Sequence, residues 1–485
     1  MRHLLLLAAV LLAAPSASAQ WVFAGNFPDS DDSTKSIQNH GLAVSPDGKV
    51  WVQAYFPFTG DSITVDPAIV ANNQAAGGSA ARTCPNTTTN NCRVTALYVY
   101  NDDGTPASFS PLSIVTLPGG VADTLGGGVF GTGASRTFDW LSGRGLTSDA
   151  DGNVYAGYGG GTTRLYKFDY EDGSVLDFVD LAQTDSRGAA GPAADDAGNI
   201  YVTGVFPGDP IAVYDPDLEY TGNVTDADFG FNRSTLALDD GLTVIALNYS
   251  ADVSTIYQRD DEFDTTWDST GTTFLGMAVE SATVHPTTGN IWVSAGSPNP
   301  DDLPTGRYDD GAGNAGFYQT HTWYEFTEAD VLSNESPVPL DSIVWVRPNN
   351  DGANGGRPRA IAFSPDGRTA YVGEYNINTP AVQKFVDTSV SNEPGMLADG
   401  TELKQNRPNP FSGSTEIAFK LANAGHVTLR VYDVMGREVA TLADRQMAAG
   451  LQSVTFDATS LAAGTYLYSL DVDGERVSRR MLLAR

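Results

Sequence analysis

The fold follows from one recurring stretch of sequence, Gly41-Leu-Ala-Val-Ser-Pro-Asp-Gly-Lys-Val-Trp-Val52. Its central Asp-Gly supplies the positive φ that a tight hairpin turn needs. The β-branched and aromatic residues on either side alternate as half-buried strands do. Loose copies recur about six times along the chain, and their turn glycines are Gly48, Gly152, Gly198, Gly241, Gly289 and Gly367.

The spacing of these hairpins indicates a repeat architecture. Three of the gaps between turn glycines, of 46, 43 and 48 residues, match the roughly 40–50 residues of a four-stranded propeller blade. Four short strands cannot bury both faces of a sheet alone, whereas sheets stacked radially in a closed ring can. We therefore predict an all-β chain with a six-bladed β-propeller over residues 20–386, in which a strand at 21–24 completes the last blade.

The repeats resemble a known group of propellers. Gly145 to Tyr155 contains Asp-Gly-Asn-Val-Tyr and is followed by Arg164-Leu-Tyr-Lys-Phe-Asp169, which resembles NHL repeats and gluconolactonase-like propellers. Gluconolactonase-like propellers hold a divalent cation in the central channel, and Ca²⁺ favours oxygen ligands. The resemblance makes Glu374 and Asn376 the candidate metal ligands, with an ordinary polar loop as the alternative.

The first residues have the pattern of an export signal. A Leu/Ala run follows Arg2, and Ala17-Ser-Ala19 is an Ala-x-Ala cleavage site. This predicts a signal peptide over 1–19, cleaved between Ala19 and Gln20. No later segment is apolar enough for us to expect a transmembrane span.

Charge and cysteine content narrow the environment. The chain carries a net charge of −31, which disfavours nucleic acid as a partner and gives the protein an acidic surface. Cys84 and Cys92 lie in one polar segment. In an exported protein such a pair predicts a disulfide. The alternative, a metal or redox pair, lacks a Cys-x-x-Cys motif and a neighbouring histidine.

Two long gaps in the repeat hold insertions, at 56–94 and 297–320. Both fall between the second and third strands of their blades, so they emerge on the same face as the loop 373–378 of the sixth blade. Long loops on a rigid scaffold often carry recognition, so this face is the predicted binding face. The glycine-rich segment 126–133 lacks the Gly-Lys-Ser/Thr of a phosphate-binding loop and is predicted to be a loop between blades.

The character of the chain changes after the propeller. Residues 387–401 have no periodicity and many turn-forming residues, which predicts a linker. Six short strands separated by turns then predict a small immunoglobulin-like β-sandwich over 402–485.

Residues of this last domain resemble the type IX secretion C-terminal sorting domain, type A. The resemblance rests on a set of short motifs with these residues: Pro408, Asn409, Pro410, Phe411, Tyr432, Asp433, Gly436, Gly464 and Tyr466. It implies that the outer-membrane type IX secretion machinery is a partner and that the protein reaches the cell surface or the medium through the periplasm. An ordinary adhesion module is the alternative.

Two hypotheses remain for the propeller. The sequence contains neither His-Glu-x-x-His nor Gly-x-Ser-x-Gly, so zincin and serine-hydrolase motifs are missing. The first hypothesis is a non-catalytic module that binds a glycan, a peptide or another protein. The second is a divalent-cation-dependent, gluconolactonase-like hydrolase. Carboxylates and amides around the channel mouth would favour the hydrolase, and an apolar or aromatic mouth would favour the binding module.

Overall fold

The structure is a computed structural model of the 485-residue chain. It describes residues 21–28, 39–57, 62–85, 88–159, 163–181, 190–204, 209–225, 232–238, 241–249, 253–261, 264–296, 307–309, 315–319, 321–346, 357–375, 382–387, 401–404, 406, 411, 413–433, 437–459, 461, 464–472 and 475–483. The chain divides into two compact units, Met1–Asp387 and Thr388–Arg485. The predicted signal peptide, and the predicted linker apart from Asp387 and Thr401, lie outside the described residues.

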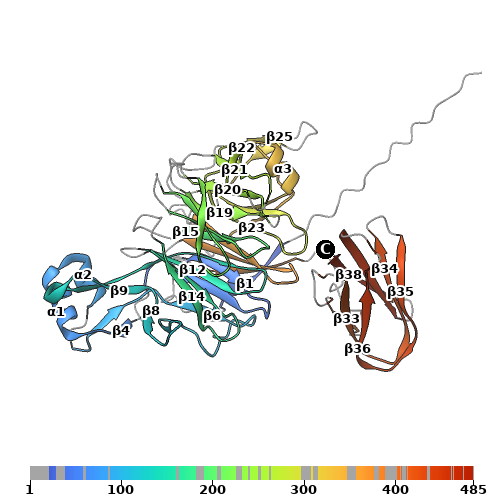
Figure 1. Ribbon diagram of the computed structural model, residues 1–485, viewed down its shortest axis with the longest axis horizontal. Coiled ribbons are helices and arrows are strands. Elements are labelled where there is room, and N and C mark those ends of the chain that lie inside the picture. The colour runs from blue at the N-terminus through green and yellow to red at the C-terminus, as the bar shows by residue number, and fades with distance from the viewer. Residues whose placement is uncertain are drawn as a thin grey trace, which may run out of the picture. The chain divides into compact units, whose positions relative to one another are not determined.

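Six of the antiparallel sheets in the first unit are each built around one copy of the repeat (Figure 1). In chain order their strands are β2 (Asn39–Val44), β3 (Val50–Ala54) and β6 (Leu97–Tyr100); β11 (Ser142–Ser148), β12 (Val154–Gly159), β13 (Arg164–Phe168) and β14 (Val175–Asp180); β15 (Ala190–Ala194), β16 (Ile200–Thr203), β17 (Ile211–Tyr214) and β18 (Tyr220–Thr225); β19 (Asn232–Ala237), β20 (Thr243–Asn248), β21 (Ser254–Gln258) and β22 (Asp268–Thr273); β23 (Val279–Val284), β24 (Ile291–Ala295), β27 (Thr322–Phe326) and β28 (Asp341–Val344); and β29 (Arg357–Phe363), β30 (Thr369–Tyr375), β31 (Val382–Asp387) and β1 (Trp21–Phe27).

The first strands of the six sheets form a closed ring. β2 contacts β11, and contacts continue through β15, β19, β23 and β29 back to β2. A ring of radially stacked antiparallel sheets is the arrangement of a six-bladed β-propeller. The ring closes through β1, which pairs with β31 as the outer strand of the last blade, as the sequence predicts (Figure 1).

The turn glycines have the conformation that the sequence demands. Between the first and second strands, Gly48 has φ 83° and Gly367 has φ 72°. The other four turn glycines of the repeat also have positive φ. A side chain in this region of φ is strained, so the glycine of each Asp-Gly or Gly-Asn pair fixes the hairpin register.

Each first strand is interrupted near its start by a shift in register. In β2 the pairing with β3 jumps between Asn39 and Gly41, which leaves His40 without a cross-strand partner. A bulge of this kind redirects the extra side chain. The inner strands also approach one another closely here, because a Cβ placed on Gly145 would lie only 2.7 Å from the Cα of Gly191 in the next blade.

Both predicted insertions lie where the sequence places them. Between β3 and β6 the chain forms β4 (Ser62–Thr64), α1 (Pro67–Ala76), α2 (Gly78–Thr83) and β5 (Asn91–Arg93). Between β24 and β27 it forms β25 (Arg307–Asp309) and β26 (Ala315–Phe317). The two helices were not predicted, although Asp66 caps α1 through a hydrogen bond from Ala68 N at 2.8 Å and Pro67 occupies the first turn, where proline is favoured. No helix that the structure describes is long and apolar enough to span a membrane.

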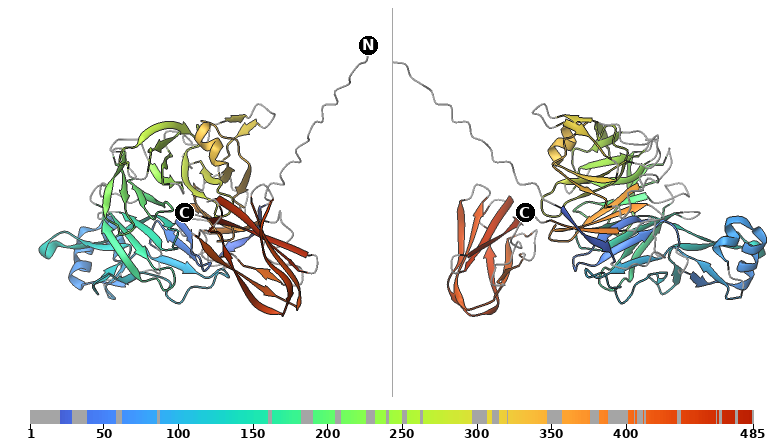
Figure 2. Two further views of the ribbon diagram at one scale, coloured as in Figure 1. Left: turned by 45° about the vertical axis from the view of Figure 1, so that its right-hand side comes forward. Right: turned by 180° about the vertical axis from the view of Figure 1, so that it is seen from behind.

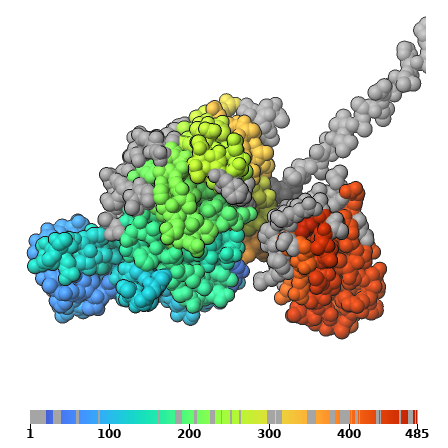
Figure 3. All heavy atoms as spheres, in the orientation of Figure 1, coloured from blue at the N-terminus to red at the C-terminus, as the bar shows by residue number. Residues whose placement is uncertain are grey.

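A third insertion precedes β11 and corrects one prediction. It contains β7 (Ile114–Thr116), β8 (Ala122–Thr124), β9 (Gly127–Phe130), η2 (Gly133–Ser135) and β10 (Thr137–Trp140). The glycine-rich segment is therefore not simply a loop, because β9 pairs with β10. β10 packs against α1 and α2, and the joint lobe projects beside the blades (Figure 3). Its small core consists of Ile69, Val70, Cys84, Cys92, Val94 and Phe138.

The second unit is a β-sandwich of two sheets (Figure 2). Their strands are β32 (Glu402–Leu403), β33 (Ser414–Leu421) and β36 (Gly450–Asp457) in one sheet, and β35 (Glu438–Met447), β34 (Gly425–Asp433), β37 (Gly464–Val472) and β38 (Glu475–Leu483) in the other. β33 alternates exposed and buried side chains along its length, as a strand with one face on a core must. The buried face contributes Ile417, Phe419 and Leu421 to the core of this unit.

Candidate functional site

The side chains released by the strand bulges gather at the centre of the first unit. In each hairpin turn, the N–H of the turn glycine donates a hydrogen bond to the carbonyl of an earlier residue, as Gly48 does to Ser45. The residue five positions before that acceptor occupies an equivalent place in every blade. In five blades this position is charged or titratable, and we call these five residues the channel ring: His40, Arg144, Arg233, Glu280 and Arg359. The third blade has Ala190 there.

The channel ring is buried. His40 and Arg144 are each 8% exposed, Arg359 is 3% exposed and Glu280 is 2% exposed. The side chain of Arg233 is 12% exposed. Because the first strands line the axis of a propeller, these side chains from separate blades meet in its central channel.

Contacts join three members of the ring, Arg233, Glu280 and Arg359. Arg359 Nη1 donates a hydrogen bond to Oε2 of Glu280. Arg233 Nε lies 3.7 Å from the same oxygen. One carboxylate of the fifth blade is thus shared by arginines of the fourth and sixth blades.

The electrostatics of the ring are cationic. Burial, followed by the charges of Arg359, Arg233 and Arg144, holds the pKa of His40 well below its usual range, so its imidazole is neutral. The pKa of Arg144 is lowered, mainly because the side chain is buried. The nearby Tyr55 raises this pKa, and the charge of Arg233 lowers it further. Within the ring, three guanidiniums face one carboxylate, although the chain as a whole carries −31.

Each arginine of the ring stacks on a tyrosine. The guanidinium carbon of Arg144 lies 4.9 Å from the ring centre of Tyr55. The equivalent distances are 4.4 Å from Arg233 to Tyr249 and 5.0 Å from Arg359 to Tyr375. The tyrosines lie at the ends of the second strands β3, β20 and β30, which is the face from which the two predicted insertions emerge.

Several polar atoms of the ring lack hydrogen bonds. His40 Nε2, Arg144 Nε and Arg233 Nε are buried without a hydrogen-bond partner among the residues that the structure describes. A buried donor left unpaired costs roughly 1–3 kcal/mol, and more when it is charged. Guanidinium groups recognise carboxylate, sulfate and phosphate through charge-assisted, often bidentate hydrogen bonds. The chemistry of the ring is therefore that of an anion site.

Of the two candidate metal ligands, only Glu374 lies within the described residues. Glu374 lies within β30, is 1% exposed, and contacts Nδ1 of His321. Asn376 lies outside the described residues. In the described part of the chain, no three His, Cys, Asp or Glu side chains converge as metal ligands. Guanidiniums at the channel centre do not fit Ca²⁺, which needs six to eight oxygen ligands.

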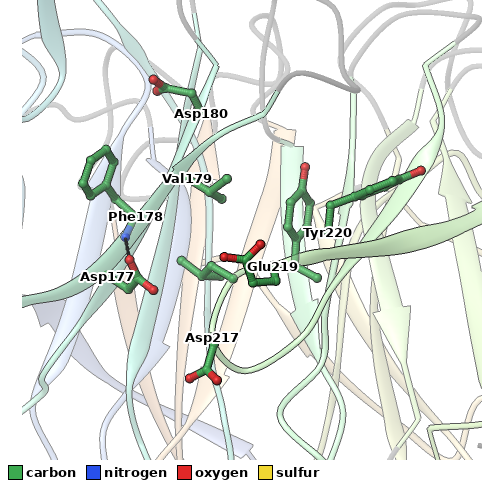
Figure 4. A pocket seen from close by; sticks show the side chains of 9 residues that line it. Asp177, Phe178, Val179, Asp180, Asp217, Glu219 and Tyr220 are labelled. Carbon is green, nitrogen blue, oxygen red and sulfur yellow. Dashed lines mark hydrogen bonds between the residues drawn. The ribbon is translucent and has the colours of Figure 1, made fainter.

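A groove lies on the outer rim between the second and third blades. It has a volume of about 240 Å³ and is lined by four carboxylates among other residues. Asp180 and Asp217 point in opposite directions (Figure 4), and Asp180 is held by Arg164 at 2.5 Å. The carboxylates do not converge, so this groove does not form a binding constellation.

The structure shows the positions of several residues that the sequence predicts to be functional. Cys84 and Cys92 form the predicted disulfide. Phe411 is 2% exposed in the core of the second unit. Tyr432 and Asp433 end β34, and Asp433 pairs with Tyr466 of β37, the strand that Gly464 begins. Some predicted residues lie outside the described part of the chain, namely Ala19, Gln20, Pro408, Asn409, Pro410 and Gly436.

Comparison with known families identifies the second unit. Residues 407–484 match the family described as the secretion system C-terminal sorting domain. The chain therefore carries a type IX sorting domain, and it is exported through the periplasm to the cell surface or the medium. The sorting domain implies the type IX secretion machinery as a partner.

Comparisons with curated proteins and with solved structures give little information about the first unit. No curated protein matches the chain. PorZ, a surface component of the type IX secretion system of Porphyromonas gingivalis, is 14% identical with a TM-score of 0.39, over 92% of this chain and 59% of PorZ. A protein of unknown function from Bacteroides caccae is 11% identical with a TM-score of 0.34, over 63% of this chain and 81% of its own. Raptor from Chaetomium thermophilum is 11% identical with a TM-score of 0.40, over 78% of this chain and 30% of its own.

Proposed function

We propose that the propeller, residues 20–386, is a non-catalytic binding module that the type IX system displays on the cell surface or releases. Its channel ring holds the anionic group of the ligand. The observation that carries this proposal is the presence of three guanidiniums in the channel ring, those of Arg144, Arg233 and Arg359. The one carboxylate of the ring, Glu280, is in contact with Arg233 and Arg359.

The energetics of the ring support a ligand. Burying a charge that is not fully paired costs several kcal/mol. Groups that carry such a cost cluster at functional sites, where a ligand offsets it. An anion in contact with Arg144 and Arg233 would accept from the donors that lack partners among the described residues. It would also oppose the two effects that lower the pKa of Arg144, which are first its burial and then the charge of Arg233.

The same ring argues against the cation-dependent hydrolase. A divalent cation in the channel would meet three positive charges within a site of low dielectric constant, where like charges repel strongly. The single carboxylate of the ring, Glu280, is already held by Arg359. The aromatic residues beside the ring are those that the binding hypothesis expects at the mouth.

A calorimetric titration tests the proposal. The full chain, at low ionic strength, is titrated with sodium sulfate and sodium glucuronate, and with glucose as the neutral control. We expect both anions to bind and glucose not to bind. Arg144→Gln and Arg233→Gln should each weaken the anions at least tenfold, which is the size of one charge-assisted hydrogen bond.

A matched variant controls for the loss of one positive charge. Lys49 lies by the turn at the other end of β2 and β3, so Lys49→Gln should leave the affinity unchanged. Anion affinity that is equal in the wild type and in Arg144→Gln would overturn the proposal. Ca²⁺ binding that is lost in Glu280→Gln would favour the hydrolase instead.

A further inference from the structure

We propose that the ligand is an acidic glycan, and that a string of aromatic side chains beside the channel ring binds its sugar rings. We call this string the aromatic path: Trp140, Phe56, Tyr55 and Tyr375. A carboxylate or sulfate of the same glycan would enter the channel ring. This inference rests on the proposed function and names its ligand class.

The aromatic path is continuous from the lobe to the ring. The ring centre of Trp140, at the end of β10, lies 5.0 Å from that of Phe56. Phe56 lies 4.4 Å from Tyr55, which lies 5.6 Å from Tyr375. Tyr55 also lies 4.9 Å from His40 and carries the guanidinium of Arg144 on its face. The path therefore leads directly to the cationic ring.

These aromatic residues do not serve the core. None of the four belongs to the hydrophobic core clusters that the described residues form. Phe56 is 40% exposed, and Tyr55, Tyr375 and Trp140 are partly exposed. Linked aromatic rings that remain outside the core next to a polar site form the apolar part of a ligand site.

The combination of chemistries favours a saccharide over a peptide. A pyranose ring presents an apolar C–H face that packs on an aromatic ring, and a uronic acid or a sulfated sugar adds an anion at its edge. Common peptide-recognition modes use a free strand edge, a groove for a helix or proline-rich segment, or a terminal carboxylate. Here the exposed feature is a row of aromatic rings that ends at guanidiniums, which suits consecutive sugar rings that carry an acid.

The test compares ligands of increasing length on the full chain. Glucuronate, a trisaccharide of uronic acids, a sulfated trisaccharide and a neutral trisaccharide are titrated in turn, with a tripeptide carboxylate as the competing class. We expect one acidic trisaccharide to bind at least tenfold more tightly than glucuronate. The neutral trisaccharide and the tripeptide should both bind more weakly than that acidic trisaccharide. Whether the uronate or the sulfated trisaccharide binds more tightly identifies the source of the anion.

Variants separate the aromatic path from the ring. Phe56→Ala and Trp140→Ala should remove the tenfold gain while glucuronate binds as before. Phe317→Ala, which truncates a 60% exposed aromatic residue in the fifth-blade insertion, should change nothing. Thermal melts of each variant confirm that it is folded.

The outcomes distinguish the two proposals. One result is that glucuronate binds but neither acidic trisaccharide binds more tightly. Another is that the tighter binding persists in both Phe56→Ala and Trp140→Ala. Either result would contradict the acidic-glycan proposal and leave the anion-site proposal standing. A tripeptide that outcompetes the trisaccharides also overturns the glycan. If glucuronate does not bind, or binds equally to Arg144→Gln, the anion site itself is wrong.

Discussion

Arg359 and Glu280 form a buried ion pair across the first strands of two neighbouring blades. Nη1 of Arg359 donates to Oε2 of Glu280, and the two residues are 3% and 2% exposed. Arg233 approaches the same oxygen at 3.7 Å from the other side. The pair therefore sets the charge balance of the channel ring, because it supplies the one carboxylate that the ring contains.

The first prediction is that Glu280→Gln destabilises the free protein and strengthens anion binding. Breaking a buried pair leaves an uncompensated charge, so the free energy of unfolding should fall by about 3–5 kcal/mol. Urea denaturation measures this fall, and all seven tryptophans lie in the first unit, so their fluorescence reports its unfolding. Sulfate should restore more stability to the variant than to the wild type.

A matched variant defines the contradicting result for Glu280. Glu416 is exposed on β33 of the second unit, so Glu416→Gln should leave the tryptophan transition unchanged. The account of the ring is wrong if Glu280→Gln behaves like Glu416→Gln. It is also wrong if sulfate stabilises the wild type more than the variant.

The second prediction concerns the pH dependence of His40. Its pKa is lowered in the folded protein by burial and by three arginines, whereas the unfolded residue has a pKa near 6.5. Below that pH the unfolded state binds a proton that the folded state does not, so stability falls as the pH decreases. The contribution of one such group is at most about 1.4 kcal/mol per pH unit.

His40→Gln should remove this part of the pH dependence. Urea midpoints at pH 7.5 and pH 5.5 should differ less in His40→Gln than in the wild type. His426 lies in the second unit with a half-exposed side chain, so His426→Gln is the control and should keep the full difference. An identical loss of stability in the wild type and in His40→Gln would show that His40 is protonated in the fold.

The third prediction is that one face of β1 latches the ring. Phe27 is 5% exposed and packs against Tyr371 and Tyr100 at 4.9 and 5.8 Å between ring centres. Phe27→Ala should cost about 3–5 kcal/mol because it empties a buried site. Phe23 in the same strand is 36% exposed, so we expect a loss of less than about 1 kcal/mol for Phe23→Ala. Equal losses by urea denaturation would contradict the latch.

The fourth prediction assigns a local role to the disulfide. Cys84 and Cys92 are eight residues apart and form part of the small core of the lobe. The double substitution to serine should reduce the local stability of the lobe by about 2–3 kcal/mol. Limited proteolysis with mass spectrometry should then show faster cleavage within 62–94, while the tryptophan transition keeps its urea midpoint. Unchanged cleavage would mean that α1 and α2 hold the lobe without the bond.

Much of the fold was predictable because it depends on local chemistry. Asp-Gly and Gly-Asn turns need glycine at positive φ, and that requirement is visible at Gly48 and Gly367. In the second unit, short strands separated by turns predicted further β structure, and β33 alternates exposed and buried side chains as such a strand should. The helix α1 was missed although Asp66-Pro67 is a helix-start signal, because a short helix inside a polar insertion has little periodicity.

The channel ring was missed for a different reason. Arg144, Arg233 and Arg359 are far apart in sequence, and only the closure of the ring brings them together. Their side chains reach the channel through bulges, whose register depends on how neighbouring strands pair. A signal did exist, because aligning the repeats on their turns places these arginines in one column. The metal hypothesis relied instead on a resemblance at Glu374, a residue of β30 that contacts His321.

Crystals of the full chain soaked in sodium selenate test the central claim most directly, because the anomalous signal of selenium locates a bound oxyanion. We predict a selenium peak in the channel within hydrogen-bonding distance of the guanidiniums of Arg144 and Arg233, and no such peak in Arg144→Gln crystals. Two results would contradict the claim that the ring is an anion-binding site. One is a carboxylate of the chain itself in contact with both arginines. The other is a channel without a selenium peak at a selenate concentration that stabilises the protein in solution.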